Sequence, residues 1–386
     1  MGLPVLIISL FDINFFQKLF LYLFLFLILI LFADMFFSIM YRKKNLINYK
    51  RIKKIPFKDI KVEPHPNLPF VYKKNHKTDN NSELQYPLHD NFTSPTTNTN
   101  NLGLVNGNDG GRDIMIPKPK NLYRINCLGA STTQNTLKDK NKDEIYSYPL
   151  LLEKKLKEKF NINLEVNNCA TGGYTSSDLL VRFLLQNIDT DPDMVILYHA
   201  YNDIRSYLTE DFHSDYHHSR KNLGESYYKF YLGSLFPYIP INFINYFQNR
   251  WFSQNHRYSL IESISNGKLD LDNQINLEKG IKTYKRNLQN LIFICKSRNI
   301  KIILCSFSFY LHDSVKNEKI HKIYQDIVLK ENLVMKELAD VNNVEFIDMY
   351  NLIPRVNENF LDTIHLAPAG LEILAEQISK KIDIIN

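Results

Sequence analysis

Residues 123–133 read YRINCLGASTT. Residues 124–128 form a short, mainly apolar run that is typical of a buried strand, and the Gly-Ala-Ser turn ends it. Apolar residues then recur at helical spacing between Tyr148 and Phe160. A strand, a turn and a helix in this order form the repeating unit of α/β proteins. The stretch therefore predicts that an α/β domain begins near residue 121.

The same alternation continues to the carboxyl end of the chain. Further strands are predicted at 164–166, 194–198, 301–305 and 344–347. Helices are predicted between them: one capped by Thr175 or Ser176, one with an apolar stripe over 281–295, and a last one that starts near Pro368. Five strands separated by helices indicate a parallel sheet that is covered by helices on both faces.

Charge and cysteine content exclude some classes of function. Lys and Arg outnumber Asp and Glu by 47 to 41, and much of this excess lies between residues 42 and 54. A basic cluster of this kind is typical of a membrane-adjacent segment, so we expect no nucleic-acid partner. The four cysteines (Cys127, Cys169, Cys295 and Cys305) lie in or beside apolar runs without metal spacing, which predicts buried thiols.

An apolar stretch near the amino end is long enough to cross a membrane. Residues 19–32 are uninterrupted apolar sequence, and the stretch continues past Asp34 to Met40, close to the ~20 residues that a span requires. The basic start, short core and small residues of a cleaved signal peptide are not clear here, and a buried core helix would rarely hold so many consecutive Leu and Phe. We therefore predict an N-terminal segment at 1–18 and one uncleaved transmembrane helix at 19–40. The following basic residues favour a cytoplasmic domain, but long domains can translocate, so the side stays open.

The rest of the chain divides into a linker and a domain. Residues 41–120 are rich in Asn, Pro, Gly, Thr and Lys and predict a basic, loop-rich linker that lays a short strand or two on the domain edge. The domain spans 121–386 and contains an aromatic-rich insert at about 207–276. The insert is either a small satellite core or, as its position suggests, a substrate-binding wall or lid.

Four short motifs carry the chemistry: Ser131 in GASTT (129–133), Gly173 in NCATGGY (168–174), Asn202 in AYND (200–203), and the pair Asp362 and His365 in DTIH (362–365). A serine hydroxyl becomes a nucleophile when a histidine takes its proton and a carboxylate orients that histidine. Backbone N–H groups and an Asn side chain can bind the oxyanion that forms. The chain supplies each of these parts once.

The first three motifs follow the first, second and third predicted strands. The carboxyl ends of parallel strands lie at one edge of a sheet, where functional residues gather, so Ser131, Gly173 and Asn202 are expected to meet there. Asp362 and His365 lie in the loop before the last helix, which can return to that edge. Ser131 is expected to open a helix, so that its N–H points toward the oxyanion.

Taken together, the four motifs resemble those of the SGNH/GDSL hydrolase family, in particular its membrane-anchored bacterial type. Ala130 stands where the family has an Asp, and Ala200 where a Gly is typical. The resemblance implies an α/β, flavodoxin-like three-layer sandwich with a five-stranded parallel sheet. It also implies a nucleophile at Ser131, a base at His365 oriented by Asp362, and an oxyanion hole from Ser131, Gly173 and Asn202, without metal or cofactor.

Each motif also has a simpler interpretation. Residues 131–133 could cap a helix, Gly172 and Gly173 could form only a tight turn, Asn202 could occupy an Asx-turn, and Asp362 and His365 could only stabilise the last helix. His213, His217 and His218 could suggest a metal site, but they lie in a polar segment without further ligands. The α/β-hydrolase fold is disfavoured because Thr133 fills the last Gly position of G-x-S-x-G.

The resemblance implies a membrane-tethered, single-pass serine esterase that acts through an acyl-enzyme, with an O-acyl or O-acetyl carbohydrate ester as the favoured substrate. An O-acyltransferase with the same residues, or a silent membrane-bound scaffold, are the alternatives. The sequence does not predict the natural substrate or the oligomeric state.

Overall fold

The structure is a computed structural model of the 386-residue chain. The residues that it describes are 13–48, 62–63, 65, 67–77, 88–89, 91–93, 98–107, 111–139, 141, 144–208, 212–216, 274–313, 315 and 318–384. The chain divides into two compact units, of which the smaller contains residues 1–56 and 222–257 and the larger contains residues 57–221 and 258–386.

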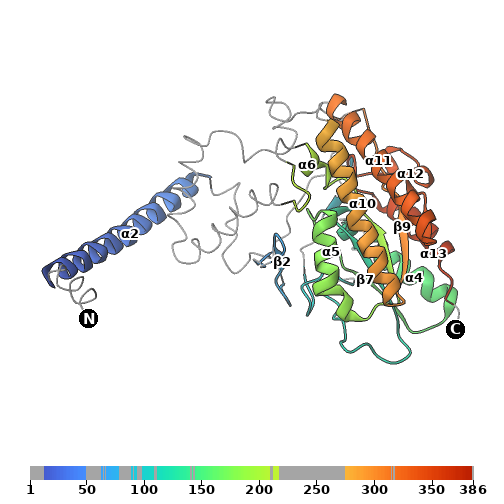
Figure 1. The fold of residues 1–386 in the computed structure, drawn as a ribbon, viewed down its shortest axis with the longest axis horizontal. Helices are drawn as coiled ribbons and strands as arrows, with labels where there is room; N and C mark the ends of the chain where they lie inside the picture. The colour runs from blue at the N-terminus through green and yellow to red at the C-terminus, as the bar shows by residue number, and fades with distance from the viewer. Residues whose placement is uncertain are drawn as a thin grey trace, which may run out of the picture. The chain divides into compact units, whose positions relative to one another are not determined.

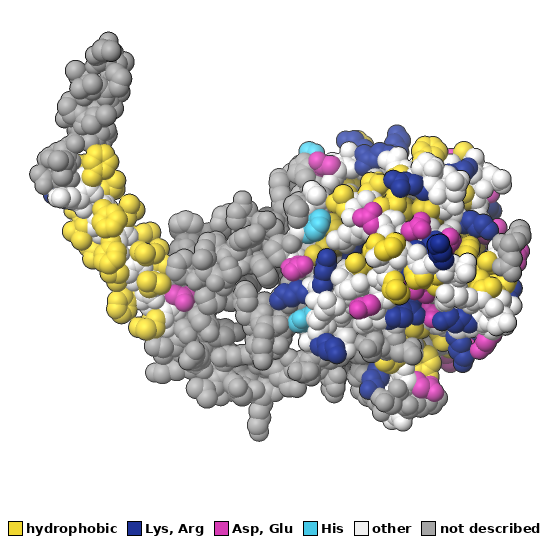
Figure 2. Space-filling view, turned by 90° about the horizontal axis from the view of Figure 1, so that it is seen from below, with side chains coloured by type: hydrophobic (Ala, Val, Ile, Leu, Met, Phe, Trp, Pro, Cys, Tyr) yellow, Lys and Arg dark blue, Asp and Glu magenta, His cyan; other side chains and the backbone are white. Residues whose placement is uncertain are grey.

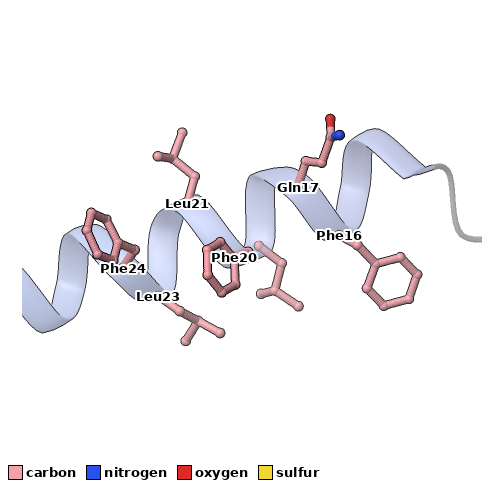
Figure 3. Close-up of a pocket in the computed structure, with 7 residues that line it drawn as sticks. Phe16, Gln17, Phe20, Leu21, Leu23 and Phe24 are labelled. Carbon is pink, nitrogen blue, oxygen red and sulfur yellow. The ribbon is translucent and has the colours of Figure 1, made fainter.

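Helix α2 (Ile13–Asn48) belongs to the smaller unit. Its residues Phe15–Phe36 form a 22-residue apolar stretch of which nothing is buried within the protein. Figure 2 shows hydrophobic side chains over the described part of this helix, and Figure 3 shows them projecting on more than one side of the helix axis. A helix that is apolar all round is matched to an apolar surrounding. Its length and composition are those of a membrane span or a signal sequence, and its apolar stretch starts earlier than the predicted 19–40.

The larger unit is built on a parallel five-stranded sheet. Its strands are β4 (Tyr123–Gly129), β7 (Leu164–Asn168), β8 (Met194–Tyr198), β9 (Lys301–Cys305) and β10 (Glu345–Ile347). Their order across the sheet is β10-β9-β8-β4-β7, and every neighbouring pair is parallel. In chain order this reads 2-1-3-4-5, the flavodoxin-like order, so the predicted fold class is confirmed.

Helices cover both faces of this sheet. Helix α4 (Tyr148–Phe160) packs against α13 (Pro368–Lys381), and α10 (Gln274–Ser297) packs between α5 (Ser176–Leu185) and α11 (Glu318–Asn342). Right-handed crossovers place these two groups on opposite faces. Figure 1 shows α5 and α10 side by side over the sheet. Together with the sheet they form the three layers.

Helix α11 is absent from the elements predicted above. Its buried residues Ile320, Tyr324, Ile327 and Val328 recur at helical spacing, so the sequence carries the signal. The predicted N-cap Thr175 is confirmed, because its side chain and that of Asp178 form a reciprocal capping box at the start of α5.

The remaining elements are short. They are β1 (Val62–Glu63), β2 (Val71–Tyr72), β3 (Phe92–Thr93), α3 (Ser131–Gln134), β5 (Leu137–Asp139), β6 (Ile145–Tyr146), η2 (Asn187–Thr190), α6 (Ile204–Tyr207), α12 (Met349–Leu352) and η3 (Asn357–Asn359). Strands β1 and β2 pair antiparallel, and β3, β5 and β6 form a three-stranded antiparallel sheet.

Part of the segment predicted as a linker packs into the larger unit. Leu104 and Ile114 are each 1% exposed and belong to its hydrophobic core. The Arg112 guanidinium donates to both Glu153 carboxylate oxygens on α4, each at 2.8 Å, and to the Val166 carbonyl on β7 at 2.8 Å. These contacts attach residues upstream of 121 firmly to the sheet.

The aromatic-rich insert lies mostly outside the described residues, which resume at Gln274. At its amino end, Tyr207, Phe212 and Tyr216 are buried. The rings of Tyr207 and Phe212, and those of Phe212 and Tyr216, meet edge to face. All four cysteines are buried and free, as predicted.

The junction between β4 and α3 is closely packed. A Cβ atom on Gly129 would lie 2.0 Å from Thr133 Oγ1 and 2.6 Å from the Tyr198 carbonyl oxygen, so only glycine fits. The Thr133 hydroxyl donates to that carbonyl oxygen at 2.9 Å. The residues on both sides of Ser131, Gly129 before it and Thr133 after it, therefore contact the end of β8.

Candidate active site

Ser131 is the first residue of the four-residue helix α3. Ala130 is the N-cap, and no side chain caps this helix. The Ser131 hydroxyl instead faces His365, with 3.0 Å between Oγ and Nε2. The interpretation of residues 131–133 as merely a helix cap is therefore wrong. Helix α3 has only one turn, so its dipole is small. A negative group near Ser131 would be stabilised mainly by the Ser131 N–H itself.

Asp362 holds the other side of the imidazole. Its Oδ2 lies 2.8 Å from His365 Nδ1, and its Oδ1 accepts the backbone N–H groups of Ile364 and His365, both at 2.8 Å. With the Nδ1–H directed to the carboxylate, Nε2 is left as an acceptor, so the Ser131 hydroxyl donates to it. Sequence positions 131, 362 and 365 thus form one continuous hydrogen-bonded chain.

The electrostatic setting keeps Asp362 ionised. Burial alone would raise the pKa of Asp362, but the electrostatic interaction with His365, the side-chain hydrogen bond to it and the two backbone N–H groups outweigh burial and hold the pKa below its usual range. The side chains of His365 and Asp362 are 23% and 29% exposed, so the pair can be reached from solvent. The loop that carries them is tied to α3, because the Asn135 amide donates to the Leu366 carbonyl at 2.8 Å.

The two glycines after β7 lie beside Ser131. A Cβ on Gly172 would be 3.7 Å from Ser131 Cβ, whereas a Cβ on Gly173 would meet no atom within 4 Å. Gly173 has φ +83, a conformation that favours glycine, and it is exposed. Among the residues that the structure describes, none accepts a hydrogen bond from the N–H of Ser131 or of Gly173. Two backbone donors beside the hydroxyl are therefore available to a bound group.

Asn202 reaches the same place from β8. Its amide Nδ2 donates to the Tyr174 carbonyl, next to Gly173, at 3.0 Å. A carbonyl can only accept, so this contact fixes which end of the amide faces the glycine turn. Tyr201, the residue before, has φ +59, a strained conformation for a side-chain-bearing residue. The structure thus brings all the predicted site residues to the carboxyl edge of the sheet.

Asp203, the residue after Asn202, holds the Asn202 turn in place through buried hydrogen bonds. This role was not predicted from sequence. Its carboxylate accepts four hydrogen bonds: from the Ser176 N–H at 2.8 Å, the Ser176 hydroxyl at 2.5 Å, the Tyr216 hydroxyl at 2.6 Å and His199 Nε2 at 2.7 Å. It therefore joins the Asn202 turn to the start of α5 and to the first residues of the insert. The position of Asp203 beside Asn202 could have drawn attention to it, but its role could not be inferred because most of its partners are distant in sequence.

Glu331 on α11 is a second buried carboxyl group under the same turn. It accepts the Tyr207 hydroxyl at 2.9 Å and the Tyr201 N–H. Burial and the nearby charge of Asp203 raise the pKa of Glu331 well above the usual carboxyl range. Asp203 and Glu331 together stabilise the strained turn that presents Asn202.

A metal site is not formed by the described part of the chain, in which no three His, Cys, Asp or Glu side chains are placed to hold an ion. His213 is exposed, and His217 and His218 lie outside the described residues. The chemistry that the site offers is that of a hydroxyl with a histidine acceptor, an ionised carboxylate behind it, and unpaired N–H donors beside it.

Comparisons with known proteins identify a family for the chain. The family model of GDSL-like lipases and acylhydrolases matches residues 127–373. A comparison with curated proteins returned no match.

Similar solved structures include three bacterial enzymes. A GDSL-like lipase from Parabacteroides merdae has 14% identity and a TM-score of 0.42, covering 67% of this chain and 94% of that one. A lipase/acylhydrolase from Enterococcus faecalis has 17% identity and a TM-score of 0.39, covering 67% and 94%. A catalytic mutant of an acetylxylan esterase from Geobacillus stearothermophilus has 16% identity and a TM-score of 0.40, covering 68% and 95%.

The family model covers well over half of the sequence and includes Ser131, Gly173, Asn202, Asp362 and His365. The chain therefore belongs to the GDSL-like lipase/acylhydrolase family and is an ester-hydrolysing enzyme.

Proposed function

We propose that the protein is a membrane-tethered serine esterase that forms an acyl-enzyme on Ser131. The observation that carries the proposal is the continuous chain from Ser131 Oγ to His365 Nε2, at 3.0 Å, and from His365 Nδ1 to Asp362 Oδ2, at 2.8 Å. Both distances lie within the range in which a general base accepts a proton. Ser131 lies 234 residues before His365 in the sequence, so the tertiary fold brings the hydroxyl to the imidazole.

In the first half of the reaction, Ser131 Oγ attacks the carbonyl carbon of the ester, and the hydroxyl proton moves to His365 Nε2. The bond between the carbonyl carbon and the alcohol oxygen then breaks, and the imidazolium returns the proton to the leaving alcohol. Asp362 stabilises the imidazolium and keeps its Nδ1–H oriented, for which its lowered pKa is suited because it remains charged.

In the second half, water attacks the acyl-serine while His365 takes its proton. The bond to Ser131 Oγ breaks, the proton passes to that oxygen, and the carboxylic acid leaves. In both halves the carbonyl oxygen becomes negative. We assign its stabilisation to the N–H groups of Ser131 and Gly173 and to the Asn202 amide, because the two N–H groups have no acceptor among the described residues and Asn202 bonds the Tyr174 carbonyl, next to Gly173.

Among esters, we propose an O-acyl or O-acetyl group on a carbohydrate. The support is the sequence resemblance to anchored bacterial members of the family and the aromatic-rich insert at about 207–276, since aromatic faces suit a sugar ring. If a sugar hydroxyl replaces water in the second half, the same residues transfer the acyl group instead of hydrolysing it.

Membrane attachment is proposed through α2. Its 22-residue apolar stretch is unburied, and nearly every side chain on it is apolar, which costs free energy in water and gains it in hydrocarbon. The side of the membrane on which the catalytic domain lies is not part of the proposal.

The nucleophile is tested by labelling with a fluorophosphonate, which reacts with an activated serine. Wild-type protein should be labelled and should cleave an aryl acetate, while Ser131→Ala should do neither. Asp362→Asn should keep the fold but lose activity by up to ~10⁴-fold, because the histidine tautomer is no longer fixed. Ser297→Ala, which removes an exposed hydroxyl from the end of α10, is the control and should match the wild type. Labelling that persists in Ser131→Ala would contradict the assignment.

The lowered pKa of Asp362 predicts a pH dependence of stability. A depressed carboxyl pKa contributes stability that is fully present above the unfolded value, about 4 for aspartate, and is lost as the pH falls through the folded value. The difference in unfolding free energy between wild type and Asp362→Asn should therefore shrink as the pH falls below about 4. Denaturant unfolding at a series of pH values measures this. A difference that grows on acidification would show that Asp362 is not held as an ionised acceptor.

Asn202→Ala should lower kcat by about 10²–10³-fold with a smaller effect on KM, the loss expected for one oxyanion donor. Steady-state kinetics on an aryl acetate checks this. Asn351→Ala removes an exposed amide that bonds only locally to Asp348, and it should leave both constants unchanged. A change confined to KM would assign Asn202 to substrate binding instead.

An uncleaved membrane anchor predicts that the full-length chain sediments with membranes. Detergent should release it, whereas alkaline carbonate should not, because a spanning helix is held by its apolar surface and not by charge. Amino-terminal sequencing of the mature protein is the companion measurement. A soluble chain that begins after α2 would identify the helix as a cleaved signal sequence.

A further inference from the structure

Gln134 links the two backbone segments that flank the Ser131 hydroxyl. It is the last residue of α3, and its side-chain Oε1 accepts the Gly172 N–H at 2.9 Å. A backbone N–H can only donate, so the amide atom facing Gly172 must be the oxygen. Because Gly172 precedes Gly173, this bond fixes the turn that carries one of the two open N–H donors.

Tyr72 holds Gln134 in that position. The Tyr72 hydroxyl donates to the same Gln134 Oε1 at 3.2 Å, and the Gly172 N–H is also within hydrogen-bonding reach of the hydroxyl. Burial raises the pKa of Tyr72, so the phenol keeps its proton at neutral pH and remains a donor. The side chain is 7% exposed, so few alternative partners in water compete for it.

The segment around Tyr72 is itself anchored on the glycine turn. The Tyr174 hydroxyl donates to the Phe70 carbonyl, and the Phe70 ring packs edge to face on the rings of both Tyr72 and Tyr174. A Cβ atom on Gly103 would lie 2.3 Å from the Tyr72 carbonyl oxygen, so the backbone at Gly103 packs closely against the backbone of Tyr72. Residues 67–77 are thereby packed against residues 171–174.

We propose that Tyr72 and Gln134 are positioning residues for the esterase reaction: they hold the Gly172–Gly173 turn so that the Gly173 N–H stays aimed at the developing oxyanion. The inference rests on the proposed function. Tyr72 lies upstream of residues 127–373, which the family model matches. The segment between α2 and the sheet thus contributes to catalysis.

Two conservative variants separate positioning from bulk packing. Tyr72→Phe removes only the hydroxyl and should lower kcat about 3- to 10-fold on an aryl acetate, the effect of one neutral hydrogen bond on the transition state. Gln134→Met keeps the side-chain length but leaves the Gly172 N–H without its acceptor, and should lower kcat about 10- to 100-fold. In both variants KM and the melting temperature should stay close to the wild-type values.

The double variant provides the sharper measurement. Because both side chains act on the same N–H, the loss in Tyr72→Phe/Gln134→Met should be smaller than the product of the two single losses. The control is Tyr123→Phe at the opposite end of β4. It removes a buried hydroxyl that has no hydrogen-bond partner among the described residues, and it should leave kcat unchanged.

The inference is overturned if Tyr72→Phe is as active as Tyr123→Phe, if the two losses simply multiply, or if lost activity only follows a lower melting temperature. Each of these results can occur while the wild type is active and Ser131→Ala is not, in which case the esterase assignment stands and only the positioning role fails. A wild type without esterase activity would overturn both.

Discussion

The close approach of β4 to β8 at Gly129 is the constraint on which the site depends. The absence of a side chain there lets Thr133 bond the Tyr198 carbonyl, and this sets where α3 starts and where Ser131 points. Any larger residue would have to push the Ser131 turn away from the end of β8, and Asn202 follows that strand directly. A shift of about 1 Å between catalytic groups is enough to cost large factors in rate. One glycine therefore keeps the hydroxyl and the Asn202 amide in register.

Buried charge is the second element of the design. Asp203 is fully buried, and four donors compensate for its lost hydration. Burial and the nearby charge of Asp203 raise the pKa of Glu331, which favours its uncharged form. Both act on the turn at Tyr201, whose left-handed backbone would relax in the absence of such support. The buried polar groups thus stabilise a strained turn that apolar packing alone would not specify, and that turn presents Asn202.

Much of the fold, and the place of the candidate catalytic residues in it, could be predicted from sequence for identifiable reasons. Buried parallel strands such as 194–198 are continuous apolar runs, and each motif follows a strand directly, so the topology alone brings Ser131, Gly173 and Asn202 to one edge. The roles of Gln134, Tyr72 and Asp203 could not be predicted, because they depend on partners that only tertiary packing brings near. Likewise, residues 98–115 read as a loop-rich linker, since their burial comes from contacts such as Arg112 with Glu153 and not from a periodic pattern.

The exposure of His365 and Asp362 bears on the fate of the proposed acyl-enzyme. His365 and Asp362 are about a quarter exposed, so water reaches the imidazole that activates the second attack. Water is far more concentrated than any sugar. A sugar hydroxyl can therefore compete with water only if the sugar is bound and oriented beside the acyl group. Such an acceptor site would have to be built by residues outside the triad, and the insert that begins at Tyr207 follows Asn202 closely in the sequence. In the proposed mechanism the triad forms the acyl-enzyme, and the groups that surround the triad set the balance between hydrolysis and transfer.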